Sequence, residues 1–75
     1  MPELRRLTAI IEREENGYSA LCPEYDIASQ GANIEKTRDN LVEALKLFFE
    51  CADASEVERR FNAEVLVTQV EVMVA

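Results

Sequence analysis

Apolar positions in the first third of the chain alternate with polar ones, which is the period of a β-strand with one buried face. Segment 4–15 is rich in β-branched residues and leads into Asn16 and Gly17. Both residues tolerate the positive φ angles that two-residue hairpin turns require. Segment 18–23 predicts the return strand, closed by Pro23, which lacks the N–H that a ladder needs. The pattern therefore predicts a β-hairpin.

The middle of the chain changes to a helical period after a short third strand. Residues 27–30 predict that strand, and Gly31 ends it. Asn33 is a good helix N-cap, and apolar side chains then recur every three or four residues. Because this stripe is wide, we expect the long helix to cover one face of a sheet. The stripe consists of Ile34, Leu41, Leu45, Phe48 and Ala52, with Val42 and Phe49 beside it.

The last third of the chain predicts a short helix and one further strand. Ser55 and Glu58 have the spacing of a capping box, which indicates a helix over about residues 56–61. Residues 64–75 then alternate, with apolar groups on both faces. Such a strand is either central in a sheet or paired with another molecule. One face carries Leu66, Thr68, Val70, Val72 and Val74, and the other carries Val65, Val67 and Met73, which we predict to form an oligomer interface.

These elements predict a small α+β fold with the order β-β-β-α-(α)-β and one long helix packed on one face of the sheet. A strand that returns by a helical crossover joins the sheet in parallel, and such crossovers are right-handed. The 75 residues are expected to form one domain. A chain of this size buries only about 60% of the surface of its unfolded form. Because the core is thin, we predict a homodimer or a larger assembly.

The chain is strongly acidic, with 15 Asp and Glu, 8 Lys and Arg, and a net charge of −7. Because phosphate is also negative, this charge disfavours direct binding of nucleic acid. The charge suits a basic protein partner, and simple solubility is the alternative explanation. The sequence shows no signal peptide and no apolar run of membrane-spanning length. We therefore expect a cytoplasmic protein.

Few residues of this chain are suited to catalysis or metal binding. No His is present to activate a serine or cysteine nucleophile. Cys22 and Cys51 are too few for a zinc site, and we expect both to be small, buried, reduced thiols. Glu12 and Glu71 could form the carboxylate pair of a two-metal nuclease, but surface charge explains them better. We expect no catalytic residue, no metal and no cofactor.

Two groups of residues are candidates for binding a partner. Glu35, Asp39 and Glu43 are spaced four apart on the long helix, opposite its apolar stripe. Like charges at this spacing repel slightly, which a solvated face tolerates and a docked cationic surface would exploit. The second group lies in segment 23–31, which joins the hairpin to the helix; there Tyr25 either anchors an interface or caps the core. That group consists of Glu24, Tyr25 and Asp26.

The ordered motifs of the chain resemble the HicB-like antitoxin family. The family pattern is an opening strand with a Gly hairpin, a Pro-Glu dipeptide, a Ser-Gln-Gly turn, and a helix with Asn-Leu and Glu-Ala-Leu. The corresponding pieces are "IIEREENGYSALCPE" over residues 10–24, "SQG" over 29–31, "NL" over 40–41 and "EAL" over 43–45. After Pro-Glu, where the family has Leu-Pro-Gly, this chain has Tyr-Asp-Ile, and its helix start also differs.

The resemblance, which covers about residues 7–50, implies a partly degraded RNase H-like fold and a toxin partner. HicA-like toxins are small basic ribonucleases, and the antitoxin would neutralise one by covering its RNA-binding surface. Many family members carry a DNA-binding module after this domain; since the chain ends at Ala75, we expect no such module here. Two alternatives remain: a solo regulatory domain whose partner is not a toxin, and a metal-dependent nuclease of RNase H-like descent.

Overall fold

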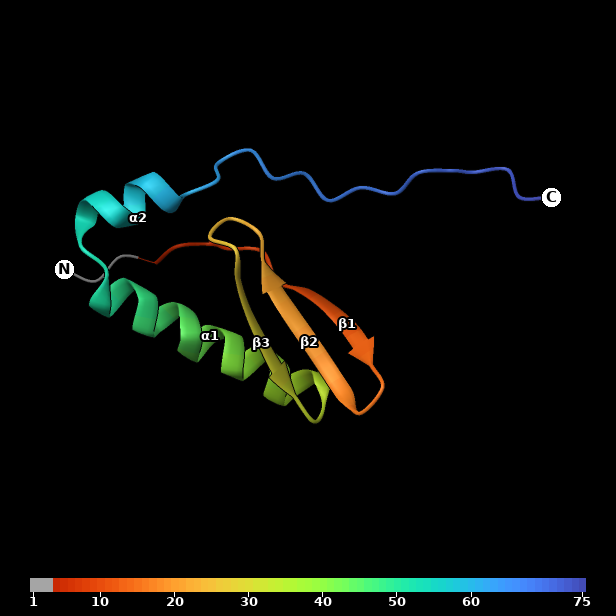
Figure 1. Cartoon of the computed structure of the whole chain (residues 1–75), viewed down its shortest axis with the longest axis horizontal. Helices are drawn as coiled ribbons and strands as arrows, with labels where there is room; N and C mark the ends of the chain where they lie inside the picture. The colour runs from red at the N-terminus through yellow and green to blue at the C-terminus, as the bar shows by residue number, and fades with distance from the viewer. Residues whose placement is uncertain (1–3) are drawn as a thin grey trace.

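Three antiparallel strands and one long helix make up the body of the protein (Figure 1). The computed structural model describes residues 4–75. Its strands pair in the order β1-β2-β3, so the predicted α+β class and the β-β-β-α order are confirmed. The elements are β1 Ile10–Glu14, β2 Gly17–Cys22, β3 Ile27–Gly31, α1 Ile34–Cys51 and α2 Ala54–Arg60.

The turn of the predicted hairpin consists of Glu15 and Asn16, one residue earlier than the predicted pair Asn16 and Gly17, and the strands of the hairpin are β1 and β2. Their antiparallel register pairs Glu14 with Gly17 at the turn. Gly17 has a φ angle of 155°, which L side chains rarely adopt. A Cβ atom there would also lie 2.5 Å from the carbonyl oxygen of Gly31. The turn therefore requires glycine both for its backbone conformation and for the space beside β3.

One face of the sheet packs against α1 and forms the core. Along β2, Ala20 and Cys22 point to this face, while Leu21 between them points to the other. From α1, Thr37 and Leu41 are buried against the sheet. The core cluster consists of Ala20, Cys22, Tyr25 and Leu41, and the partly buried side chains around it are Leu7, Ile11, Ile27, Leu45, Phe48, Phe49 and Val57.

The junction between β3 and α1 fixes how the helix crosses the sheet. The Asn33 side chain caps α1 as predicted, accepting a hydrogen bond of 2.8 Å from the backbone N–H of Lys36. The buried Thr37 hydroxyl donates to the Asn33 carbonyl oxygen at 2.7 Å. A Cβ on Gly31 would lie 2.6 Å from the Thr37 nitrogen, so glycine permits this close approach. As a result, α1 lies over β3 and β2 and has few contacts with β1.

The short second helix exists, but its predicted capping residue is wrong. The N-cap is Asp53, whose carboxylate accepts a 2.8 Å hydrogen bond from the Glu56 N–H and a 2.7 Å bond from the Ser55 hydroxyl. These two donors hold the pKa of the Asp53 carboxyl below its usual value. Ser55 therefore supports the cap and does not provide it. None of the helices within residues 4–75 combines the length and apolar character of a membrane span.

The prediction of a fourth strand near the C-terminus is wrong for the isolated monomer. Residues 62–75, here called the tail, form no strand and leave the body beside α2, in blue in Figure 1. The described part of the chain shows no backbone–backbone hydrogen bond to residues 63–75. Leu66 is 85% exposed and Met73 is 99% exposed. The radius of gyration, 14.7 Å, exceeds the value of about 11 Å for a compact chain of this length.

The point at which the tail leaves α2 explains why it does not join the sheet. The N–H of Asn62 donates a 2.7 Å hydrogen bond to the carbonyl oxygen of Glu24, in the connection between β2 and β3. The tail thus begins at the end of the sheet and beside α2, not along the open edge of β1. An alternating sequence is compatible with a strand, but a strand forms only where a partner edge satisfies its backbone groups.

Candidate functional site

The connection between β2 and β3, residues 23–26, holds several distant parts of the chain together. The Glu24 carboxylate accepts hydrogen bonds from Thr8, at 3.0 Å from its N–H to each oxygen and at 2.7 Å from its hydroxyl. The Glu24 carbonyl oxygen accepts the bond from Asn62, and the Tyr25 carbonyl oxygen accepts a 3.1 Å bond from Arg60. The connection therefore ties the N-terminal segment, α2 and the start of the tail to the sheet.

The hydrogen bonds around Glu24 also set its charge. Burial acts to raise the pKa of this carboxyl, but the Thr8 hydroxyl and N–H outweigh that effect and hold the pKa below its usual value. The Cys22 thiol donates to Glu24 at 3.4 Å. Burial, and then the neighbouring carboxylate, raise the pKa of the Cys22 thiol. Glu24 is thus a structural anion and Cys22 a neutral donor beside it.

Tyr25 caps the core, which was one of the two roles considered for it. Its side chain is 1% exposed, and its ring centroid lies 5.2 Å from those of Phe48 and Phe49 and 5.4 Å from that of Phe61. Its hydroxyl accepts a 3.2 Å hydrogen bond from Arg5. The ring is therefore inside the domain, and a partner-binding role for Tyr25 and Glu24 stays a prediction.

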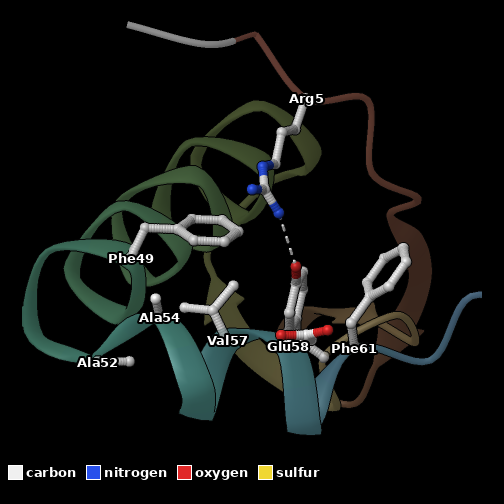
Figure 2. Close-up of a pocket in the computed structure, with 8 residues that line it drawn as sticks. Arg5, Phe49, Ala52, Ala54, Val57, Glu58 and Phe61 are labelled. Carbon is white, nitrogen blue, oxygen red and sulfur yellow. Dashed lines mark hydrogen bonds between the residues drawn. The ribbon is translucent and has the colours of Figure 1, made fainter.

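An open pocket lies above this aromatic cluster, between α1, α2 and the N-terminal segment (Figure 2). It has a volume of about 570 Å³. The Arg5 guanidinium reaches over the Phe49 ring, 5.4 Å from its centroid, and bonds to the Tyr25 hydroxyl, as the dashed line in Figure 2 shows. The lining is mixed: the Arg5 guanidinium and the Glu58 carboxylate lie beside aromatic and small apolar side chains. It is lined by Arg5, Tyr25, Phe49, Ala52, Ala54, Val57, Glu58 and Phe61.

Sequence reasoning missed this pocket, hereafter the aromatic pocket, because its residues come from four separate parts of the chain. The available signal was the small number of aromatic residues, three Phe and two Tyr. The gathering of the three Phe around Tyr25 could not be read from spacing, since it depends on where α2 packs.

The predicted acidic line on α1 is present as an exposed surface. Glu35, Asp39 and Glu43 are all exposed, and within residues 4–75 none of them has a salt-bridge partner. Asp26 is also exposed, at a positive φ of 55°. It precedes β3, whereas Glu35 follows that strand at its other end. The structure therefore groups the three helix carboxylates, hereafter the acidic face, and leaves Asp26 apart from them.

The two cysteines and the residues predicted to form an oligomer interface lie partly in other surroundings than predicted. Cys22 is buried as predicted, but Cys51 is exposed at the last residue of α1. Val65, Val67 and Met73 all lie in the tail, where Val67 and Met73 are exposed and Val65 is half-buried.

The two carboxylates considered for a nuclease are not neighbours in the fold. Glu12 is exposed on β1, and Glu71 lies in the exposed tail. Among the residues that the structure describes, no group of three or more His, Cys, Asp or Glu side chains is placed to hold a metal ion.

The ordered motifs of residues 7–50 all lie in the body of the fold. They give the order of a Gly hairpin, a Pro-Glu dipeptide, a Ser-Gln-Gly turn and a helix, and the structure places this order on β1, β2, β3 and α1. No protein-family model, no curated protein and no solved structure matches the chain.

Proposed function

We propose that this chain is an antitoxin-like protein-binding module that neutralises a basic, HicA-like ribonuclease by covering its RNA-binding surface. The observation that carries the proposal is the acidic face: Glu35, Asp39 and Glu43 stand exposed in one line on α1, and no salt bridge joins them to a cation among residues 4–75. This line imitates the spaced negative charges of a nucleic acid backbone. A surface that binds RNA phosphates would accept it for the same electrostatic reason.

The charge of the whole molecule supports the same partner. At −7, the domain attracts a basic protein over a distance of about one Debye length and repels RNA. The Asn33 side chain caps α1, and the buried Thr37 and Leu41 hold the opposite face of the helix on the sheet. The acidic face is therefore carried by a rigid element, and it needs no rearrangement before it binds.

The proposal includes a family and a fold. The order β-β-β-α and the motifs in residues 7–50 favour a HicB-like domain with a partly degraded RNase H-like fold. In this proposal the protein acts in the cytoplasm, by binding alone, and contributes no catalytic step.

The direct test is neutralisation of a purified HicA-like toxin. RNA cleavage is followed by gel while the wild-type protein is added up to a stoichiometric excess. We expect cleavage to stop near a one-to-one ratio at low salt. The inhibition should weaken as salt rises, because the contact is electrostatic. Undiminished cleavage at excess would show that the protein is not an antitoxin for such an enzyme.

The acidic face is tested by a triple variant, Glu35→Gln, Asp39→Asn and Glu43→Gln. The affinity for the toxin should fall by about tenfold or more, mainly through slower association. The matched control removes three charges from the hairpin, as Glu12→Gln, Glu14→Gln and Glu15→Gln, and should cost much less. Equal losses of affinity in the two variants would mean that the toxin responds to the net charge of the protein and does not bind the acidic face specifically.

The two alternatives predict different results in the same samples. A regulatory domain with another partner would leave RNA cleavage unchanged and would still bind a basic protein that is not a nuclease. A nuclease of RNase H-like descent would bind Mg²⁺ or Mn²⁺ and cleave RNA without any toxin, and a metal titration of the pure protein would show this.

A further inference from the structure

The face of α1 toward β1 is open, and it forms a second, more apolar cavity. Because α1 lies over β3 and β2, a groove of about 460 Å³ remains between the helix and the extended segment that precedes β1. Val42, in its wall, is 45% exposed. The groove, here called the β1-edge groove, is lined by Leu4, Arg5, Leu7, Thr8, Ala9, Arg38, Leu41, Val42, Leu45, Lys46 and Phe49.

The strand beside this groove has a free edge. Within residues 4–75, β1 pairs with β2 and with no other strand, so along its outer side its backbone N–H and C=O groups are available to a further strand. Such an edge accepts an extended segment through backbone hydrogen bonds, and apolar side chains of that segment enter the neighbouring groove. The β1-edge groove therefore suits an extended segment with alternating apolar residues.

The tail has the complementary properties. It is extended, its backbone from residue 63 onward is unpaired within the described chain, and its large side chains are exposed on both faces. A segment of this kind requires a sheet edge and an apolar cover. The exposed apolar residues of the tail are Leu66, Val67, Val70, Val72, Met73 and Val74.

The charges of the groove and the tail are also complementary. In a chain with a net charge of −7, the described lining of the groove includes three basic residues, Arg5, Arg38 and Lys46, and no acidic residue. The tail carries Glu64 and Glu71 and no Lys or Arg. Each therefore attracts the other, whereas two grooves or two tails repel.

The tail of the same copy begins on the wrong side of the groove. Arg5 and Phe49 line both the groove and the aromatic pocket, so their stacked pair forms the wall between the two cavities. Phe61, the last residue before the tail, lines only the aromatic pocket (Figure 2). Asn62 is then bonded to Glu24. The tail thus leaves the body on the side of the aromatic pocket and not on the side of its own groove.

We propose that two copies exchange tails: residues 64–75 of each copy add a strand to the β1 edge of the other, with their apolar side chains in its β1-edge groove. The exchange is reciprocal, so it closes as a dimer. It gives the tail the role that its sequence predicts, a strand apolar on both faces that pairs with another molecule. This inference is independent of the proposed toxin partner.

Sedimentation equilibrium of the full-length protein from low to high micromolar concentration is the first measurement. We expect a mass of twice 8.5 kDa at the upper end. Two charge-reversal variants test the contact: the groove variant, Arg38→Glu with Lys46→Glu, and the tail variant, Glu64→Lys with Glu71→Lys. In each, the dissociation constant of the dimer should be about tenfold higher than in the wild type. A matched reversal outside the groove, Lys36→Glu with Arg59→Glu, should leave the mass unchanged.

Mixing the groove and tail variants provides the decisive experiment. In a mixed dimer, the acidic groove of the groove variant binds the basic tail of the tail variant. The wild-type tail of the groove variant binds the wild-type groove of the tail variant, so both contacts join opposite charges. A dimer should therefore form in the mixture at concentrations where each variant alone is monomeric. Circular dichroism confirms that every variant is folded. A wild-type protein that is monomeric would overturn the proposal, and this is the result expected if the tail folds into its own groove. A mixture that stays monomeric would also overturn it.

Discussion

Glu24 is the side chain that connects the most parts of this small domain. It accepts bonds from Thr8 through its carboxylate and from Asn62 through its carbonyl oxygen. Its lowered pKa shows that the fold favours the charged form. Because hydrogen bonds to a charged group are stronger than neutral ones, this one residue stabilises the N-terminal segment against the sheet.

We expect Glu24→Gln to lower the free energy of unfolding by about 1–3 kcal/mol at pH 7. Since the folded-state pKa lies below the ordinary value of 4.5, this stabilisation is complete above pH 4.5 and is lost as pH falls through the folded-state value. The difference between wild type and variant should therefore shrink below pH 4.5. Urea unfolding at several pH values measures it, with the exposed Glu12→Gln as the control. A difference that did not change with pH would contradict the assignment.

The two cysteines should react at very different rates. Cys51 is exposed, whereas Cys22 is buried and its thiol pKa is raised, which leaves little of the reactive thiolate. A coloured disulfide reagent should therefore modify one thiol rapidly in the native protein and the second only after unfolding. In the Cys51→Ser protein the rapid phase should disappear. Rapid modification of both thiols in the wild type would show that Cys22 is accessible.

At the scale of elements, the β3–α1 junction decides which strands the helix covers. Gly31 lets Thr37 approach the strand, and the Asn40 side chain donates a 2.8 Å hydrogen bond to the Gln30 carbonyl oxygen. Both contacts hold α1 over β3. The groove beside β1 stays open because α1 lies over β3, and one helix is too narrow to cover three strands evenly.

Gly31→Ala should force the helix away from β3. The added Cβ would lie 2.6 Å from both the nitrogen and the hydroxyl oxygen of Thr37, and the backbone nitrogen cannot turn aside as a flexible side chain can. We expect a loss of about 1–3 kcal/mol in the free energy of unfolding, the usual cost of overpacking. Gln30→Ala, whose side chain is exposed on the same strand, should cost less than about 0.5 kcal/mol. Chemical denaturation of both variants makes the comparison, and equal stability would argue against a tight junction.

At the scale of the whole molecule, the chain consists of a small packed body and an unpaired tail. Among the described residues, the buried apolar core consists of four side chains, Ala20, Cys22, Tyr25 and Leu41. Domains of this size are marginally stable alone. The apolar residues of the tail are the largest reserve of surface that association could bury.

The melting temperature should therefore depend on protein concentration. If the tail exchange forms, a hundredfold increase in concentration should raise the melting temperature by about 5 °C or more, because only the folded chain associates. The Glu64→Lys, Glu71→Lys protein should melt below the wild type at each concentration at which the wild type is dimeric, because its dimer is weaker. Differential scanning calorimetry provides the measurement, and a melting temperature independent of concentration in the wild type would count against self-association.

Local chemistry determined most of the elements of this protein. The alternation in segment 4–15, the turn residues around Asn16, and the cap at Asn33 act over a few residues, so the sequence predicts the hairpin and α1 correctly. The acidic face also follows from the sequence, because a helical period places Glu35, Asp39 and Glu43 in one line.

Only the tertiary structure decided where these elements meet. The role of Tyr25 depends on Phe48, Phe49 and Phe61, which α1 and α2 bring around it. The tail has the pattern of a strand, but a strand needs a partner edge, and Asn62 fixes the tail at Glu24, away from the edge of β1. Periodicity specifies which face of a segment is apolar; it cannot specify which surface covers that face, because the covering groups lie far away in the chain.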